Sequence, residues 1–444
     1  MPIASVPAPG PGAWAEARSR LRRAATTEPG RLRILGAVLA LVVVAFGTVT
    51  GFEVADRADA ADDVVSRSQP LSADAADIYR SLADADTAAA GAFLSGPQEP
   101  ADIRERYARD ISTASRLLVE AAASTDGSSE SGREIATLNE GLPRYTGLVE
   151  RARAANRQGL PLGGAYLRYA NQQMTTQLLP AAQRLYDAET ARLHRDDADA
   201  RDLPYASLVL GLVAVAALVW AQRRDQRLTN RVFNQGLLAA TAASVVVLLW
   251  LATAHTLARS GLTEAQEHGQ SSLQVLNTAR ISSLKARANE NLTLVARGSV
   301  LTDDGLNDKY ETDYTAGMAA LTGALDRAGE LADDEEGRGP LSEAASRAGE
   351  WRQRHQAARA MDDAGDYEGA LSRIIGPKES TGQSFDQIDA ALKRALDHEQ
   401  AEFGRAAEGG RDALTALPLG AAGLAVLGAA GIVVGINRRL SEYR

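Results

Sequence analysis

The sequence contains no cysteine, and aromatic residues make up only 5% of its 444 positions. Without cysteine the chain has no disulfide framework, no thiolate metal site and no cysteine nucleophile. The formal net charge of −9 argues against nucleic-acid binding, because domains that bind nucleic acid present a basic face to the phosphate groups. The length suits two or three domains.

Signature motifs of catalysis are also missing. The sequence has no Gly-rich phosphate-binding loop, no His-Glu-x-x-His motif and no kinase or nucleophile-elbow pattern. Its five histidines are dispersed without ligand spacing, and we expect them on exposed helix surfaces. The acidic run 333–336 is typical of a solvated turn rather than a metal site. The sequence therefore predicts a protein that is not an enzyme and has no metal or other cofactor.

Charged residues are absent from four long segments, 34–52, 203–222, 232–254 and 413–437. Each is long enough to cross about 30 Å of hydrocarbon as a helix that rises about 1.5 Å per residue. The first segment is an uncleaved anchor rather than a signal peptide, because no small-x-small cleavage site follows it. The segments also lack the ionisable residues that ion-coupled transporters place at mid-depth. The sequence therefore predicts a membrane protein that is not a transporter.

Arginines indicate the orientation in the membrane. Arg223, Arg224, Arg227 and Arg231 face a single aspartate in the short loop 223–231, and both chain ends are also basic. Basic residues near short loops are retained in the cytoplasm, so we expect both termini inside and the two long acidic segments outside the plasma membrane.

The predicted organisation alternates inner segments, membrane helices and outer domains. In chain order these are the basic, largely disordered N-terminus 1–33, the first membrane helix 34–52, outer bundle 53–202, second membrane helix 203–222, inner loop 223–231, third membrane helix 232–254, outer bundle 255–412, fourth membrane helix 413–437 and inner tail 438–444.

The two halves read as an internal duplication. Gly164 to Arg168 aligns with Gly369 to Arg373, and Tyr107 and Arg184 align with Tyr310 and Arg394. Apolar residues recur every three or four positions in both outer segments, and no strand pattern competes. Glycine, proline and polar turn residues divide each segment into four helices. The fold class is therefore an all-α membrane protein with four transmembrane helices and two tandem extracytoplasmic four-helix bundles.

Two features leave alternatives open. The pairs Gly47/Gly51 and Gly431/Gly435 in the membrane segments are compatible with a homo-oligomer or with packing inside one chain. Arg168, which aligns with Arg373, has the planar donors that clamp a carboxylate, but a salt bridge accounts for it as well.

The inner segments are too short to hold a folded kinase or other catalytic domain, so the output of a signal requires a separate cytoplasmic partner. Residues Arg223, Arg224, Arg227 and Arg231 are candidate contacts for that partner, and basic residues near the N-terminus can also contact the anionic lipid bilayer. Thr26 and Thr27 follow a basic stretch and are candidate phosphoacceptors.

Residues 154–168 read AANRQGLPLGGAYLR and are followed by Leu-Leu-Pro-Ala-Ala at 178–182. This stretch resembles GlnX-type membrane proteins of actinobacteria, and the four-helix topology with two outer domains fits the same family. The outer domains are also loosely similar to the four-helix-bundle domains of chemoreceptors. The resemblance implies a relay between an extracytoplasmic solute-binding lipoprotein of the GlnH type and a cytoplasmic Ser/Thr kinase of the PknG type, which regulates glutamate and nitrogen metabolism.

Five residues in this stretch are candidates for a signalling turn or partner contact, namely Asn156, Gly159, Pro161, Tyr166 and Arg168. Glycine and proline here are equally typical of a simple connection between two helices. Two other functions remain open: a chemoreceptor-like sensor that binds a small molecule directly, and a structural protein of the cell envelope.

Overall fold

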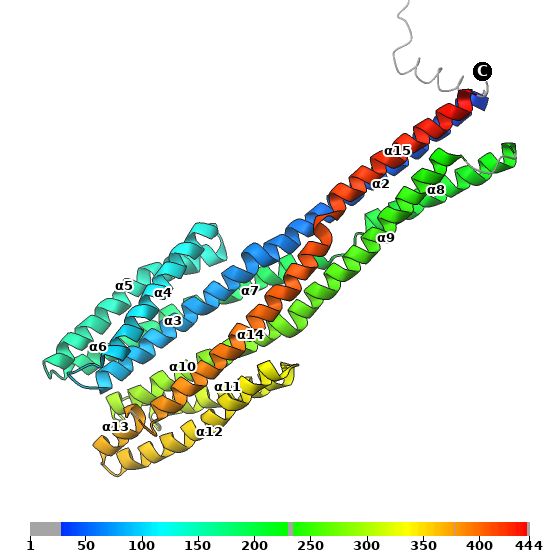
Figure 1. The fold of residues 1–444 in the computed structure, drawn as a ribbon. Helices are drawn as coiled ribbons and strands as arrows, with labels where there is room; N and C mark the ends of the chain where they lie inside the picture. The colour runs from blue at the N-terminus through cyan, green and yellow to red at the C-terminus, as the bar shows by residue number, and fades with distance from the viewer. Residues whose placement is uncertain (1–27, 230–233, 377, 442–444) are drawn as a thin grey trace, which may run out of the picture. The chain divides into compact units, whose positions relative to one another are not determined.

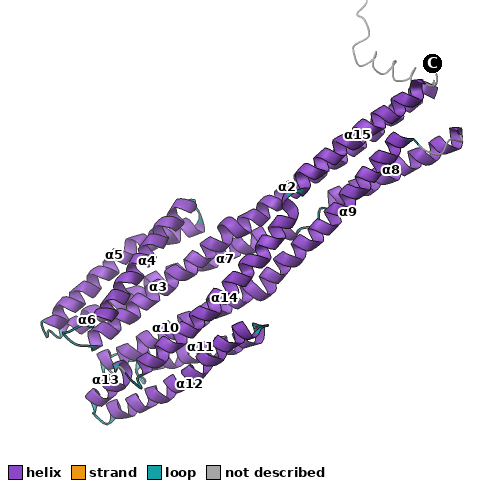
Figure 2. Cartoon of the chain, in the orientation of Figure 1, coloured by secondary structure: helices purple, strands orange, loops and turns teal. Residues whose placement is uncertain are grey.

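The computed structural model describes residues 28–229, 234–376 and 378–441, and these residues are nearly all helical (Figure 2). They contain no strand; a single isolated bridge pairs Leu301 with Asp308. The expectation of an all-α chain is therefore confirmed. Thr26, Thr27 and Arg231 lie outside the described residues.

The chain forms two compact units, which we describe separately. One takes the described residues of the ranges 1–61, 199–260 and 409–444, and the other takes those of 62–198 and 261–408. The two outer segments of the sequence thus contribute to one compact unit.

The first unit contains the apolar helices α2 (Glu28–Asp63), α8 (Tyr205–Thr229), α9 (Gln235–Glu264) and α15 (Leu417–Ser441). One buried cluster takes a residue from each of them, Phe46, Ala214, Val247 and Ala421. The described part of the chain has four helices that are long and apolar enough to cross a membrane.

The glycine pairs of this unit pack against helices of the same chain. A Cβ atom built on Gly47 would lie 2.1 Å from the Cβ of Ala425, and one built on Gly435 would lie 3.0 Å from the Cα of Gly236. Helices α2 and α9 therefore approach α15 closely, and packing inside one chain accounts for both pairs.

Helix α8 is longer than its uncharged segment. It continues to Thr229, so Arg223, Arg224 and Arg227 lie on a helix and not in the predicted loop. Arginine has a high helix propensity, so the helix can continue beyond the last apolar residue. The guanidinium of Arg224 lies 5.5 Å from the ring centroid of Trp220 on the same helix.

In the second unit, the first repeat consists of α3 (Gln69–Leu94), α4 (Ala101–Ser124), α5 (Glu130–Arg157), α6 (Leu162–Gln173) and α7 (Leu179–Arg201). A π-helical turn at Val64–Ser68 precedes α3, and another at Met174–Leu178 joins α6 to α7. The breaks at 95–100, 125–129 and 158–161 fall on glycine, proline and polar residues, which the sequence predicts to divide the helices.

The second repeat consists of α10 (Ser271–Ala296), α11 (Lys309–Leu331), α12 (Glu335–Asp363), α13 (Tyr367–Ile375) and α14 (Thr381–Thr415). A π-helical turn at Ala265–Gln270 precedes α10, as in the first repeat. Unlike α6 and α7, α13 and α14 are separated by a break that the sequence did not predict.

Matched residues stabilise corresponding points of the two repeats. Ser129 and Asp334 cap the third helix of each repeat by accepting a hydrogen bond from the backbone N–H three residues later. Arg184 pairs with Glu134 at 2.8 Å, and its counterpart Arg394 pairs with Glu343 at 2.5 Å. These contacts support the internal duplication that the sequence predicts.

The two repeats share one hydrophobic core, because α3 packs against α10 (Figure 1). The hydroxyl of Thr87 donates to the carbonyl oxygen of Leu284 at 3.2 Å, and the amide of Asn291 donates to the carbonyl oxygen of Thr87 at 3.5 Å. The ion pair between Arg106 and Asp386, at 3.1 Å, also joins the repeats.

Candidate functional site

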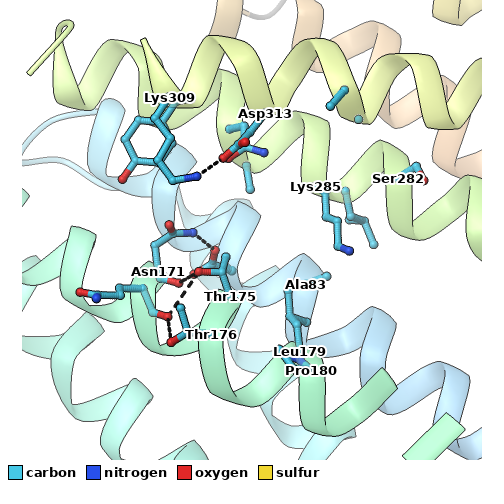
Figure 3. Close-up of a pocket in the computed structure, with 18 of the residues that line it drawn as sticks. Ala83, Asn171, Thr175, Thr176, Leu179, Pro180, Ser282, Lys285, Lys309 and Asp313 are labelled. Carbon is cyan, nitrogen blue, oxygen red and sulfur yellow. Dashed lines mark hydrogen bonds and ion pairs between the residues drawn. The ribbon is translucent and has the colours of Figure 1, made fainter. Parts of the chain in front are cut away.

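A cavity of about 890 Å³ lies between the two repeats. Its walls come from α3, α6 and α7 of the first repeat and from α10 and α11 of the second (Figure 3). The volume falls in the range of small-molecule sites. Polar side chains from both repeats line it, including Asn171, Thr175, Lys285 and Lys309.

Helix α3 contributes Tyr79, Ala83 and Asp86 to the cavity wall. Their spacing of four and three residues places them on one face of the helix. Asp86 is only 4% exposed. Its two carboxylate oxygens accept hydrogen bonds from the Tyr145 hydroxyl at 3.1 Å and from the Asn171 amide at 2.7 Å.

The environment of Asp86 raises the pKa of its carboxyl group to about 6. Burial is the dominant cause, and the hydrogen bonds from Asn171 and Tyr145 offset it in part. Among the described residues, no hydrogen bond or ion pair joins this carboxylate to a cation. The wall of the cavity thus holds a buried acid that is stabilised by neutral donors.

Three cationic side chains also line the cavity. Lys309 forms an ion pair with Asp313 at 2.5 Å, and the Lys285 ammonium lies 5.6 Å from the ring centroid of Tyr79. Arg168 is half-buried and has no ion pair within the part of the chain that the structure describes. The cavity can therefore contact groups of either charge.

The second repeat also buries a carboxylate, but it surrounds that carboxylate with cations. Glu290 is fully buried and accepts hydrogen bonds from Arg287 at 2.5 Å, from Trp351 at 3.1 Å and from His355 at 2.9 Å. Trp351 and Tyr145 are each the fourteenth residue before a left-handed glycine, Gly365 and Gly159 respectively, so they occupy matched positions of the third helix. In each repeat, an aromatic side chain of that helix donates to the buried acid.

His355 is buried in this network, contrary to the expectation that the histidines are exposed. Burial disfavours its charge, but hydrogen bonds to Glu290 and Glu311 outweigh that effect and raise the pKa of His355 to about 9. Its ring stacks on Tyr314 with a centroid separation of 3.7 Å. His255 is buried as well.

Asp334, His398 and Glu402 form the group of described residues whose potential ligand atoms lie close enough together to hold a metal ion. The Nε2 atom of His398 lies 3.1 Å from Asp334 and 3.7 Å from Glu402. The hydrogen bond between His398 and Asp334 accounts for the shorter distance, so the group does not require a metal.

The structure separates the five residues of the candidate signalling turn. Arg168 lines the large cavity, whereas the other four residues lie in the connection between α5 and α6 or in the core beside it. Asn156 donates to the carbonyl oxygens of Phe93 and Gly96 at 3.1 and 3.2 Å. These bonds fasten the α5 end to the turn between α3 and α4.

The remaining turn residues have structural roles. Gly159 has φ +67°, which glycine adopts without strain, and it ends α5. Pro161 precedes the first residue of α6, and Tyr166 packs against the shared core. Arg373, which aligns with Arg168, pairs with Glu379 at 3.6 Å on the surface. The salt-bridge interpretation therefore holds for Arg373, and Arg168 differs from it.

Asp86 was missed from the sequence, although a signal for it exists. Asp84 and Asp86 interrupt an alanine-rich stretch of α3 that otherwise contains small apolar residues. Asp84 pairs with Arg106 at 2.9 Å, so the two neighbouring acids have different partners. Only the positions of α4 and α6 beside α3 reveal which acid lacks a cation.

Comparison with known proteins gives one match. Residues 60–198 match the family model of the actinobacterial sensor domain. The matched segment covers the first repeat, including Asp86 and Arg168. It supports the general sensor class. No curated protein and no solved structure matches the chain.

Proposed function

We propose that this protein is a transmembrane sensor that detects a small molecule outside the plasma membrane and passes the signal to a separate cytoplasmic partner. The cavity between the repeats carries the proposal, because half of the residues that line it belong to the segment that matches an actinobacterial sensor domain. That match favours a sensing role over a purely structural role in the envelope.

The distribution of arginine supports the orientation. Arg223, Arg224 and Arg227 lie in the last turns of α8, and Arg231 follows in the sequence before the next apolar helix. Basic residues at such places are retained on the cytoplasmic side. In this orientation the ranges 53–202 and 255–412 are extracytoplasmic four-helix bundles in tandem. Binding at the seam between the repeats would select one of two arrangements of α3 and α10 and shift their populations.

The proposed output partner is a Ser/Thr kinase of the PknG type, which the resemblance of residues 154–168 to GlnX-type proteins implies. The arginines of α8 that the structure describes, Arg223, Arg224 and Arg227, are its candidate contacts. Glutamate and nitrogen metabolism would be the regulated process.

The same resemblance favours a second route for the input, in which a GlnH-like lipoprotein binds an amino acid and docks on the outer unit. The two routes differ in what binds first. Direct sensing requires that a purified chain binds the small molecule by itself, whereas the relay requires the lipoprotein.

The test is recovery of partners from mildly solubilised membranes with and without acidic amino acids, followed by mass spectrometry. We expect a Ser/Thr kinase to accompany the full chain and to be reduced by replacing Arg223, Arg224 and Arg227 with glutamine. Recovery of a solute-binding lipoprotein would favour the relay route. Recovery of no kinase under either condition would contradict the proposed output.

A further inference from the structure

We propose that the cavity between the repeats binds a small zwitterion, whose ammonium or guanidinium group pairs with Asp86 and whose anionic group contacts Arg168. This inference deepens the proposed sensory function and rests on it. It follows from a comparison of the two buried acids and from the charges that line the cavity.

The cationic group of the ligand is inferred from a comparison of the residues that lie beside Asp86 and Glu290. Three residues before Glu290 the chain has Arg287, whose guanidinium reaches the carboxylate at 2.5 Å. Three residues before Asp86 it has Ala83, which lines the cavity. The small side chain leaves the space beside Asp86 open where the second repeat has its own guanidinium.

The second cation of the Glu290 network is missing from the first repeat in the same way. His355 lies four residues after Trp351 on α12, and it donates to Glu290. Four residues after Tyr145, the chain has the buried Val149. The aromatic donor is thus present in both repeats, but both internal cations are present only beside Glu290.

A ligand cation would complete the coordination of Asp86. Each carboxylate oxygen accepts one hydrogen bond from the protein and can accept another. At this buried site, a charge-assisted hydrogen bond is stronger than one between neutral groups. The raised pKa of Asp86 is consistent with an acid that is buried without a counter-charge.

The anionic group is inferred from Arg168. Its guanidinium belongs to a half-buried residue on the cavity wall and has no ion pair in the described part of the chain. Lys309 is satisfied by Asp313, and Lys285 is exposed beside Tyr79. A guanidinium recognises a carboxylate or phosphate with two parallel donors, so Arg168 is the preferred anion contact.

The test uses three probes of the same length, 6-aminohexanoate, hexylamine and hexanoate, titrated into the full chain in nanodiscs by calorimetry at pH 7.5. We expect 6-aminohexanoate to bind best, hexylamine to bind less tightly and hexanoate not to bind. Asp86→Asn should weaken the binding of 6-aminohexanoate and of hexylamine by at least about tenfold, which corresponds to about 1.4 kcal/mol. Arg168→Gln should weaken the binding of 6-aminohexanoate but leave the affinity for hexylamine unchanged.

Glu140→Gln is the matched control, because Glu140 forms an exposed ion pair with Arg144 outside the cavity. It should leave all three affinities unchanged. Preferred binding of hexanoate, the failure of all three probes to bind, or equal affinities in wild type and Asp86→Asn would overturn the ligand class. Retention of the kinase in the membrane experiment would then show that the sensor role stands without this ligand.

Discussion

Glu290 in the second repeat lies within hydrogen-bond distance of Arg287 and His355, whereas Asp86 in the first repeat contacts the neutral donors of Tyr145 and Asn171. A buried carboxylate with cationic partners is a self-contained part of a folded core. A buried carboxylate without one destabilises the fold and is retained where it has another use. The two repeats thus differ in how they neutralise a buried acid: the second uses its own cations, whereas the first leaves that place to the proposed ligand.

The largest effect on stability should come from removing the charge of Glu290, whose cationic partners lie in the same repeat. Glu290→Gln leaves the buried Arg287 without its counter-charge and leaves His355 with Glu311 alone. Removing one partner of a buried ion pair typically costs about 3–5 kcal/mol. We expect a large fall in the unfolding temperature of the full chain. Glu343→Gln, which removes an exposed ion pair in the same repeat, should cost no more than about 1 kcal/mol. Equal effects of the two substitutions would contradict the assigned role of Glu290.

The second repeat should also lose stability in alkali. The pKa of His355 is about 9 in the folded protein and 6.5 in the unfolded chain, so protonated His355 contributes its full stability below pH 6.5. The contribution is lost as the pH rises through 9, and its size is roughly 3 kcal/mol. Chemical denaturation from pH 6 to 10 measures it. His355→Gln should remove this dependence, and an unchanged pH profile in that variant would refute the assignment.

The stability of the first repeat should depend on pH in the acidic range. The pKa of Asp86 is raised from 3.8 to about 6 by burial, so the unfolded chain loses this proton before the folded protein does. Stability therefore falls as the pH rises from about 4 to 6, by roughly 3 kcal/mol at most. Denaturation at pH 4 and pH 7 checks this, with Asp86→Asn as the comparison.

Asp86→Asn should be more stable than the wild type at pH 7, by about 1–2 kcal/mol, because a neutral amide removes the cost of a buried charge. A stabilising substitution that weakens binding is typical of functional residues. A loss of stability in this variant would instead indicate that the ionised carboxylate holds α3 to α5 and α6.

The smallest effect should come from the ion pairs that the repeats have in common. Arg184→Gln and Arg394→Gln each remove an exposed guanidinium, and each should cost less than about 1 kcal/mol. Thermal unfolding at low and high salt measures both. A cost above about 2 kcal/mol in either variant would show that the two repeats differ at this point as well.

Much of the fold could be predicted from the sequence because helix periodicity and turn residues are local signals. The helices end near Leu94, Ser124 and Arg157, where glycine, proline and polar residues interrupt the apolar pattern. Helix α8 continues to Thr229, beyond its uncharged segment, because uncharged length measures a membrane segment and not the helix that contains it.

The site could be predicted only in part. Arg168 was identified through its motif, but Asn156 and Gly159 in the same motif hold a helix connection. Asp86 was missed because the missing cation is a property of three helices packed together. A sequence shows that an acid is present in an apolar stretch, but it does not show which neighbours neutralise it.

The central claim is that the space beside Asp86 accommodates a cationic group that pairs with its carboxylate. A double-mutant cycle between Ala83→Arg and Asp86→Asn tests this claim most directly. Arginine at position 83 has the spacing from Asp86 that Arg287 has from Glu290. At pH 7.5, denaturation should give a favourable coupling free energy of at least about 1.5 kcal/mol between positions 83 and 86. Additivity of the two substitutions within about 0.5 kcal/mol would contradict the account.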